Sequence, residues 1–300
     1  MKRNKKIHTP TILFVVLVAV SLFIGIVPGA EDKINSIIRG EKAVISLEKV
    51  PDFSGKPFVE INGNIPVFDN VNEVSESFET YGERDVLGRC TAAFALIGRE
   101  TMPDEERESI AEIIPTGFKN REYDFIEGGY VYNRCHLIGF QLTGENANTR
   151  NLITGTRYMN VEGMLPFENM IADYVKETQN HVLYRVTPIF DGNDLVARGV
   201  QLEAKSIEDK GKGICFNVYV YNNQPGIIIN YSNGKSARAG EELPDNDLET
   251  EYILNTNSKK FHTTDCSGAK NISPKNKTRF KGDRDELISQ GYSPCGTCDP

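Results

Sequence analysis

Histidine is scarce in this chain. Only four of the 300 residues are histidine, and His8 lies in a short N-terminal segment that has the character of a targeting signal. Any chemistry that needs an imidazole group must therefore use His136, His181 or His262. This shortage restricts the search for a catalytic centre before any motif is considered.

The sequence also lacks a net positive charge. Its formal net charge is −8, and without residues 1–30 there are 30 Lys and Arg against 42 Asp and Glu. Such a balance excludes a generic polyanion-binding protein. A nucleic-acid substrate remains possible, because affinity depends on the local field at a cleft and on the charge of any bound metal. We expect weak, salt-sensitive and non-processive binding to such a substrate.

The apolar run near the N-terminus is shorter than a typical membrane-spanning helix. Residues 2–6 are rich in Lys and Arg, and residues 12–27 are apolar except for Ser21 and Gly25. This run of about 16 residues falls between the core of a signal peptide and the roughly 20 residues that span a bilayer. We predict that residues 1–30 are a signal peptide or a membrane anchor, with cleavage slightly favoured. The protein is expected to be secreted or anchored on the extracellular face of the membrane.

Composition and patterning divide the rest of the chain. Residues 31–50 are a polar spacer, and residues 51–232 alternate strand-like runs, such as 58–61 and 182–186, with turn signals. After Pro166, the spacing of Phe167, Met170, Ile171, Tyr174 and Val175 predicts one amphipathic helix with these apolar side chains on one face. Residues 233–251 lack periodicity and form a linker, and residues 252–300 form a small separate module. The expected fold class is α+β, with a mixed or antiparallel central sheet.

His136 is the histidine with the most informative surroundings. It ends a strand-like run over residues 129–136, and Arg134 lies two positions earlier, on the same face of a strand. Arginine can hold a phosphate through two hydrogen bonds, and histidine can deprotonate water. A lone histidine after a strand is more often structural, and His181 has no comparable neighbours.

An amide-rich stretch follows. Residues 145–151 contain three asparagines, Asn160 comes nine residues after Asn151, and Glu168 comes eight residues after Asn160. An amide oxygen and a carboxylate can together hold a hard, hydrated cation. Alternatively, Asn160 caps a turn and Glu168 is an acid stabilised by the dipole at the start of the helix.

The residues 133–136, 151–154, Asn160 and Glu168 resemble the motifs of the DNA/RNA non-specific endonuclease family. The resemblance covers most of residues 51–232 and implies the ββα-metal nuclease fold. It also implies His136 as general base, Asn160 as the ligand of Mg²⁺ or Mn²⁺, and Glu168 as a water-mediated metal contact. Arg134 would contact phosphate, and Asn151 would support the site.

That resemblance implies hydrolysis of DNA, and also of RNA, with little sequence preference and with 5′-phosphate ends. The chain departs from the usual Asp-Arg-Gly-His motif, because Asn133 and Cys135 replace the acid and the glycine. We expect a lower rate from these changes and an unchanged role for His136. Arg150 and Arg157 are interpreted as charges on the surface or at the rim of a cleft.

The module at residues 252–300 carries a second constellation. His262 and Cys266 form one close pair, and Cys295 and Cys298 form another, which is the arrangement that tetrahedral Zn²⁺ requires. The spacing resembles the zinc-binding module of the Ada DNA-repair methyltransferases. The alternative is a disulfide from Cys266 to Cys295 or Cys298. Seven Lys and Arg against one Asp between residues 255 and 281 would suit a bound polyanion or a cell-wall polymer.

Two functions therefore compete. The first is an exported nuclease, and the second is a non-catalytic surface protein that captures nucleic acid through its basic tail. The N-terminal segment would add a membrane contact if it is retained, and no protein partner can be inferred. Cys90, Cys135 and Cys215 lie in apolar or strand-like contexts and are expected to be buried free thiols, although an exported protein can also form disulfides.

Overall fold

The computed structural model describes residues 44–68, 76–243, 250–282, 287–288 and 290–298. The predicted targeting segment at residues 1–30 and most of the spacer lie outside these ranges, as do residues 244–249 of the predicted linker. Within the described ranges, no helix has both the length and the apolar character needed to cross a membrane. The predicted domain boundaries stay predictions.

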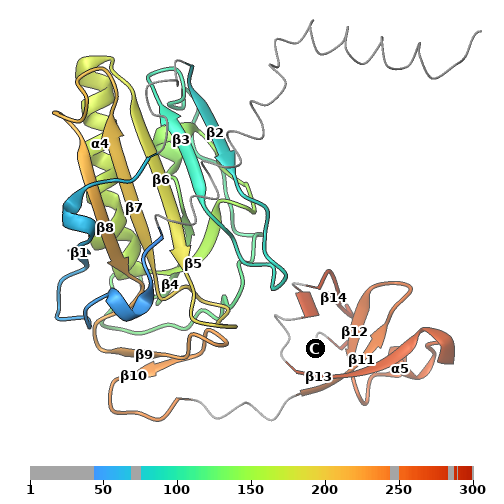
Figure 1. Ribbon diagram of the computed structural model, residues 1–300. Coiled ribbons are helices and arrows are strands. Elements are labelled where there is room, and N and C mark those ends of the chain that lie inside the picture. Colours follow the sequence, from blue (N-terminus) through green and yellow to red (C-terminus); the bar gives the residue numbers. More distant parts are fainter. Residues whose placement is uncertain (1–43, 69–75, 244–249, 283–286, 289, 299–300) are drawn as a thin grey trace, which may run out of the picture. The chain divides into compact units, whose positions relative to one another are not determined.

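A six-stranded antiparallel sheet forms the centre of the larger folded part (Figure 1). Its strand order is β1-β8-β7-β6-β3-β2. The strands expected at residues 58–61 and 182–186 are confirmed, with β1 ending one residue earlier, at Glu60, and β6 extending to Ile189. The six strands are β1 (Phe58–Glu60), β2 (Phe78–Tyr81), β3 (Ala93–Ile97), β6 (Val182–Ile189), β7 (Gly199–Ser206) and β8 (Cys215–Tyr221).

Alternate side chains of each strand point to the same face of the sheet. On one face these side chains are apolar. These side chains form a single core with helix α4 (Leu165–Thr178). Pro166 lies in the first turn of this helix, as expected. In the helix, Phe167, Ile171 and Val175 are buried as expected. Met170 was expected on the same face but is 48% exposed, because it lies beyond the edge of the contact with the sheet.

The opposite face carries a buried polar row. Arg185, Glu203 and Asn217 are paired neighbours on β6, β7 and β8, so their side chains lie on one line across the sheet. Arg185 donates two hydrogen bonds to Glu203, at 2.9 and 2.6 Å. Both side chains are almost fully buried, at 4% and 1% exposure. A buried ion pair of this kind needs every partner satisfied.

The chain before β2 supplies the remaining partners. The carbonyl of Val67 accepts from Arg185, and its N–H donates to Glu203. The carbonyl of Ile65 accepts from Asn217. Further along the same sheet face, side chains at positions 45, 47 and 50 pack against a cluster that contains Tyr219 and Tyr221. Residues 44–50, assigned to the spacer from sequence, therefore pack on the folded body.

A second unit of two strands and a helix joins the central core. Strand β4 (Tyr132–His136) pairs antiparallel with β5 (Leu152–Thr156), from Tyr132↔Thr156 to His136↔Leu152. After β5 the chain passes through a π-helical segment, Met159–Met164, directly into α4. The order β4, β5, helix is the ββα arrangement that the resemblance implied. The remaining elements of this part are η1 (Leu47–Lys49), η2 (Asn62–Asn64), α3 (Phe140–Thr143), β9 (Ile227–Ile229) and β10 (Ser236–Arg238).

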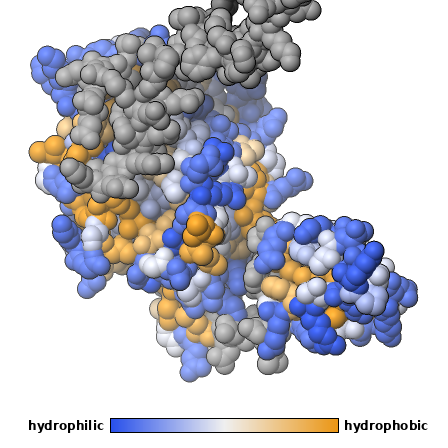
Figure 2. All heavy atoms as spheres, turned by 45° about the vertical axis from the view of Figure 1, so that its right-hand side comes forward, coloured by the Kyte–Doolittle hydropathy of each residue, from blue (hydrophilic) through white to orange (hydrophobic). Residues whose placement is uncertain are grey.

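The C-terminal residues form their own four-stranded sheet, in the order β13-β11-β12-β14. Separate apolar clusters cover its two faces, one of them built around cysteines. In the view of Figure 2, hydrophilic residues cover much of the visible surface of this unit and surround a smaller apolar area. Its elements are β11 (Thr250–Asn255), β12 (Lys260–Thr263), α5 (Ser267–Lys270), η5 (Pro274–Asn276), β13 (Lys277–Gly282) and β14 (Ser293–Pro294).

The polar row generates a stability prediction. Glu203→Ala leaves the buried Arg185 guanidinium without its carboxylate, and should lower the free energy of unfolding by about 3–5 kcal/mol. Asp124→Ala is the matched control, because Asp124 pairs with Arg238 at 2.6 Å but is 80% exposed. That change should cost about 0–1 kcal/mol. Urea unfolding followed by circular dichroism measures both, and equal losses would contradict the role assigned to the row.

Candidate active site

A cleft of about 930 Å³ opens beside the ββα unit. Its walls come from the loop at residues 107–111, from β4 and α3, and from the π-helical segment with the start of α4. Four residues predicted from sequence line this one cleft: Arg134, His136, Asn160 and Glu168. The fold therefore brings together side chains that are spread over 35 positions of the chain.

Strand alternation places the two cleft residues of β4. Arg134 and His136 are two positions apart and project from the same face, whereas Cys135 points to the other side and is fully buried. The ladder with β5 holds both residues in register, His136 opposite Leu152 and Arg134 opposite Thr154. The end of β4 thus presents an imidazole and a guanidinium to the same space.

The hydrogen bonds of His136 define its protonation. Its Nε2 lies 2.8 Å from the backbone carbonyl of Asn146, and since a carbonyl only accepts, Nε2 carries the hydrogen. In the neutral ring, Nδ1 is then unprotonated, and the Arg107 guanidinium lies 3.4 Å from it. Burial lowers the pKa of His136, and the charge of Arg107 acts in the same direction. A neutral imidazole with one unprotonated nitrogen is what a general base requires.

Glu168 faces the cleft from the first turn of α4. It is almost fully buried, and one carboxylate oxygen accepts the N–H of Gly139 at 2.9 Å. A Cβ atom at position 139 would lie 2.5 Å from the other oxygen, so only glycine allows this approach. Burial raises the pKa of Glu168 to about 7. A nearby cation would favour the ionised carboxylate and lower this pKa.

Asn160 belongs to the π-helical segment and is half-buried in the cleft wall. Its Oδ1 accepts a hydrogen bond from the thiol of Cys135 at 3.0 Å. An amide oxygen and a buried carboxylate are hard oxygen donors, which suit Mg²⁺ or Mn²⁺ better than a soft metal. The residues present therefore fit the metal that the resemblance implied.

Arg134 is held against the cleft wall. Its Nε donates to the carbonyl of Ile113 at 2.5 Å, and its guanidinium stacks over the ring of Phe118 at 4.5 Å. Burial lowers the pKa of Arg134, although the group remains charged at neutral pH. The stacking fixes the direction of the side chain before any anion binds.

The sequence reading missed Arg107. It stands within the acidic stretch of residues 104–108, where a solvated loop is the ordinary expectation. Arg157 also lines the cleft, and its Nε is buried without a hydrogen-bond partner. The sequence contains no local signal for the approach of Arg107 to His136, because the two residues are 29 positions apart and the loop path decides the contact.

Asn151 lies behind the cleft and does not line it. Its side chain is fully buried, and Oδ1 accepts the N–H of Ile138 while Nδ2 donates to the Ile138 carbonyl, both at 2.9 Å. These two bonds fix the backbone immediately after His136. The side chain of Asn151 is therefore placed to hold the backbone of the site and not to contact a molecule in the cleft.

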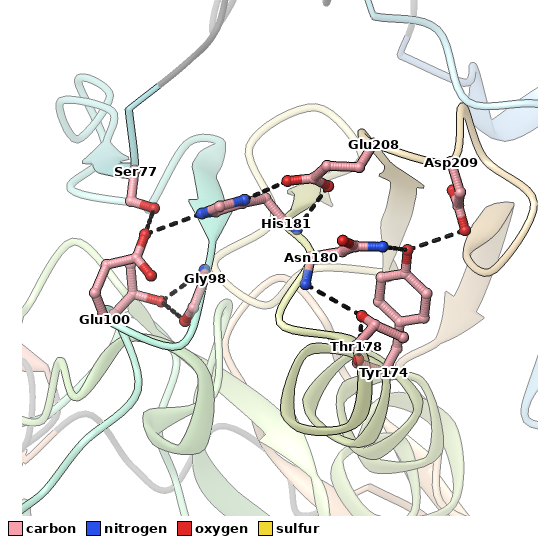
Figure 3. A network of polar contacts seen from close by, with 10 residues as sticks. Ser77, Gly98, Glu100, Tyr174, Thr178, Asn180, His181, Glu208 and Asp209 are labelled. Carbon is pink, nitrogen blue, oxygen red and sulfur yellow. Dashed lines mark hydrogen bonds and ion pairs between the residues drawn. The ribbon is translucent and has the colours of Figure 1, made fainter.

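His181 lies in a separate polar network, shown in Figure 3. Its Nδ1 is 2.5 Å from Glu208 and its Nε2 is 3.2 Å from Glu100, which also binds Ser77. Hydrogen bonds to these carboxylates raise the pKa of His181, and the bond to Glu208 has the largest effect. Both ring nitrogens are engaged and the charged form is favoured, so His181 is unsuited to act as a base.

The C-terminal sheet brings together the second predicted set. The ligand atoms of His262, Cys266, Cys295 and Cys298 all lie within 4.8 Å of one another. Burial lowers the pKa of His262, and backbone hydrogen bonds from Thr297 and Cys298 lower the pKa of Cys295 to about 7. Zn²⁺ binds the neutral form of histidine and the thiolate form of cysteine, and the two lowered pKa values favour these forms.

All six cysteines are free thiols in this structure. Cys90 and Cys135 are buried as expected. The expectation for Cys215 was wrong, because it begins β8 with its side chain exposed. A strand-like sequence predicts that side chains alternate between two faces. It does not show whether the first side chain of the strand is covered by other parts of the chain.

Residues 69–208 match the sequence model of the DNA/RNA non-specific endonuclease family. A deoxyribonuclease of Streptococcus dysgalactiae subsp. equisimilis is 29% identical to this chain over 127 residues. The aligned part is 41% of this chain, and it spans 36% of the length of that relative. The family and this relative are nucleases, which are hydrolases acting on nucleic acids. These matches support the nuclease family for this part of the chain.

Solved structures share the fold. NucA from Streptococcus agalactiae with magnesium bound superposes with a TM-score of 0.57 at 23% identity, covering 64% of this chain and 93% of NucA. The form with no metal bound gives 0.56 at 23% identity, covering 64% and 92%. The Sda1 nuclease with bound zinc gives 0.51 at 24% identity, covering 63% and 98%. The α+β, ββα-metal nuclease fold expected from sequence is confirmed.

The position of Asn151 generates the prediction for this site. Asn151→Ala removes both bonds to Ile138 and leaves two buried backbone groups without partners, so unfolding should become easier by roughly 2–5 kcal/mol. Asn148→Ala is the control, since its side chain accepts only the exposed N–H of Arg150. Its effect should stay below about 1 kcal/mol. A small effect for Asn151→Ala in denaturant unfolding would show that the loop after His136 is held by other contacts.

Proposed function

We propose that residues 51–232 form an exported, sequence-non-specific endonuclease that hydrolyses phosphodiester bonds of DNA, and of RNA, with one Mg²⁺ and His136 as general base. One observation supports this above the others. A buried, neutral His136 with an unprotonated Nδ1 lines the same cleft as the oxygen donors of Asn160 and Glu168. That combination would provide a base and a cation site in one cleft.

His136 would take a proton from the attacking water at Nδ1. The water must lie within hydrogen-bond reach of that nitrogen, on the side where the Arg107 guanidinium now lies. A phosphate bound by Arg107 and Arg134 would therefore place its phosphorus beside the activated water. The bond from Nε2 to Asn146 keeps the ring oriented while Nδ1 gains the proton.

Asn160 and Glu168 would hold the metal. When bound, Mg²⁺ stabilises the negative charge that develops on the phosphate and on the leaving oxygen. Glu168 would contact the metal through water, as the resemblance implies, and the oxygen that does not accept from Gly139 is the one available for this contact. Mn²⁺ would serve the same oxygen donors.

The substrate class follows from the groups in the cleft. Three arginines line it, at positions 107, 134 and 157, and they suit backbone phosphates. Residues 51–232 nevertheless contain 16 Lys and Arg against 27 Asp and Glu, so attraction over long distances is weak. Binding should be salt-sensitive and largely independent of base sequence.

The C-terminal unit would hold a structural Zn²⁺ through His262, Cys266, Cys295 and Cys298. Strand β13 is at the edge of its sheet (Figure 1). It carries Lys277, Arg279 and Lys281 at alternate positions, and all three are exposed. Such a row would retain a polyanion near the acidic nuclease domain and raise its effective concentration. Arg279 also pairs with Glu251, which weakens the positive field of the row in part.

Export rests on the character of residues 1–30, which would leave the protein secreted or, if they are retained, anchored outside the membrane. The rival function is a non-catalytic surface protein that captures nucleic acid. The cleft favours the enzyme, because a capture protein has no need for a buried neutral imidazole beside oxygen donors. Cleavage of plasmid DNA with Mg²⁺, abolished by EDTA, would separate the two.

The base and the metal ligand should respond differently to substitution. His136→Ala should lower turnover by roughly 10²–10⁴ while Mg²⁺ binding changes little, because only the proton acceptor is lost. Asn160→Ala should lower the rate and also raise the Mg²⁺ concentration needed for half-maximal rate. Initial rates on plasmid DNA across a Mg²⁺ titration measure both effects.

His181→Ala is the control for these variants, since His181 lies outside the cleft. Its turnover should stay within about threefold of the original. Near-normal cleavage by His136→Ala would refute the assignment of the base, whereas near-normal cleavage by Asn160→Ala would refute the metal site.

The proposed zinc site of the C-terminal unit is tested by measuring the metal content of the protein. The full chain should carry one Zn²⁺ per molecule, and Cys266→Ser or Cys298→Ser should lose it, because a tetrahedral site needs all four ligands. Elemental analysis of purified protein gives the ratio, and Cys90→Ser serves as the control. A disulfide from Cys266 to Cys295 or Cys298 in the native protein, detected by mass spectrometry, would overturn the zinc assignment.

A further inference from the structure

Cys135 stands where two elements that build the cleft meet. It lies on β4 between Arg134 and His136, and its side chain points away from both, into the core. Its Sγ lies 3.0 Å from Oδ1 of Asn160 and 3.5 Å from the sulfur of Met164, which both belong to the π-helical segment, and 3.6 Å from the backbone carbonyl of His136. The thiol therefore connects the strand that carries the base to the turn that carries the amide.

The space for this side chain is provided by β5. Gly155 pairs with Asn133 in the ladder, two positions before Cys135, and a Cβ atom there would come within 2.6 Å of the Cβ of Cys135 and 3.1 Å of its sulfur. A larger residue at position 155 would push the thiol away from Asn160. The contact between Cys135 and Asn160 therefore depends on the cysteine at position 135 and on the glycine at position 155.

The thiol decides which end of the amide is presented. The oxygen and the NH₂ group of an asparagine have nearly the same shape, so steric fit alone does not select one of them. A thiol donates one hydrogen bond and is a weak acceptor, so it favours the amide oxygen beside it. An amide oxygen has two lone pairs, and the one not used by the thiol remains available for a cation in the cleft.

We propose that Cys135 is a positioning residue that fixes the side-chain amide of Asn160 with its oxygen available to the catalytic cation. The proposal rests on the proposed function, because it takes Asn160 as a metal ligand. It explains why a side chain stands where the usual motif has glycine, which could make no such bond. Partners of metal ligands typically change metal affinity or activity by about 10- to 100-fold when they are removed.

The test compares variants of the full chain. Cys135→Ala and Cys135→Val remove the donor, and valine keeps most of the volume, so one of them remains informative if the other fails to fold. Cys135→Ser keeps an O–H donor and should rescue. Cys90→Ala is the matched control, because Cys90 is also buried in the same core and donates only to backbone carbonyls, at 3.2 and 3.4 Å.

Two readouts separate positioning from stability. Calorimetric titration with Mn²⁺ in the absence of substrate should show affinity weakened by about tenfold in the Ala and Val variants, and within about threefold of the original in Cys135→Ser and Cys90→Ala. Turnover at saturating metal should fall much less than metal affinity, because His136 is untouched. Thermal unfolding without metal records the loss of stability in each variant.

The outcomes distinguish this proposal from the function it rests on. If the Ala and Val variants bind Mn²⁺ as tightly as the original chain, the role of Cys135 is refuted while the nuclease assignment stands. If Cys135→Ser is as weak as Cys135→Ala, the donor is not what matters and the proposal is again refuted. If the original chain neither binds Mn²⁺ nor cleaves nucleic acid with any divalent metal, the proposed function itself fails.

Discussion

The pairing of β4 with β5 is the constraint on which the cleft depends. It runs from Tyr132↔Thr156 to His136↔Leu152, and it fixes which side chains of β4 face outward and which face the core. The chain leaves β5 directly into the π-helical segment and α4, so Asn160 and Glu168 are placed relative to the same ladder. A shift of this register by one residue would turn His136 into the core and bring Cys135 to the cleft.

Burial sets the chemical character of the cleft, and it acts in opposite directions on the two titratable groups. It lowers the pKa of His136 and raises the pKa of Glu168, because in each case the charged form loses hydration. The result is a neutral imidazole in the same cleft as a carboxyl group whose ionised form would be favoured by a cation. His181 shows the reverse situation, since its two carboxylate partners favour the protonated ring.

The large sheet supports this arrangement from behind. Its apolar face packs against α4, while its other face buries the row of Arg185, Glu203 and Asn217 under the chain around Val67. The inner strands β3, β6, β7 and β8 are buried along almost all of their length, and the ββα unit packs into the same core. The four-stranded C-terminal sheet has separate apolar clusters of its own, and its histidine and cysteine cluster is built from residues 262–298.

The sequence alone was sufficient to single out His136, Asn160 and Glu168, which line one cleft, and the four histidine and cysteine side chains that cluster in the tail, because scarcity and spacing are properties of the chain itself. It also predicted the helix after Pro166, since periodicity reports the face that an element buries. Tertiary structure decided the rest. The approach of Arg107 to His136, the hydrogen bond that leaves Nδ1 unprotonated, the place of Asn151 behind the cleft and the exposure of Cys215 all depend on loop paths and on packing between distant segments. Local pattern carries no information about such contacts, because their partners are fixed only when the chain closes around its core.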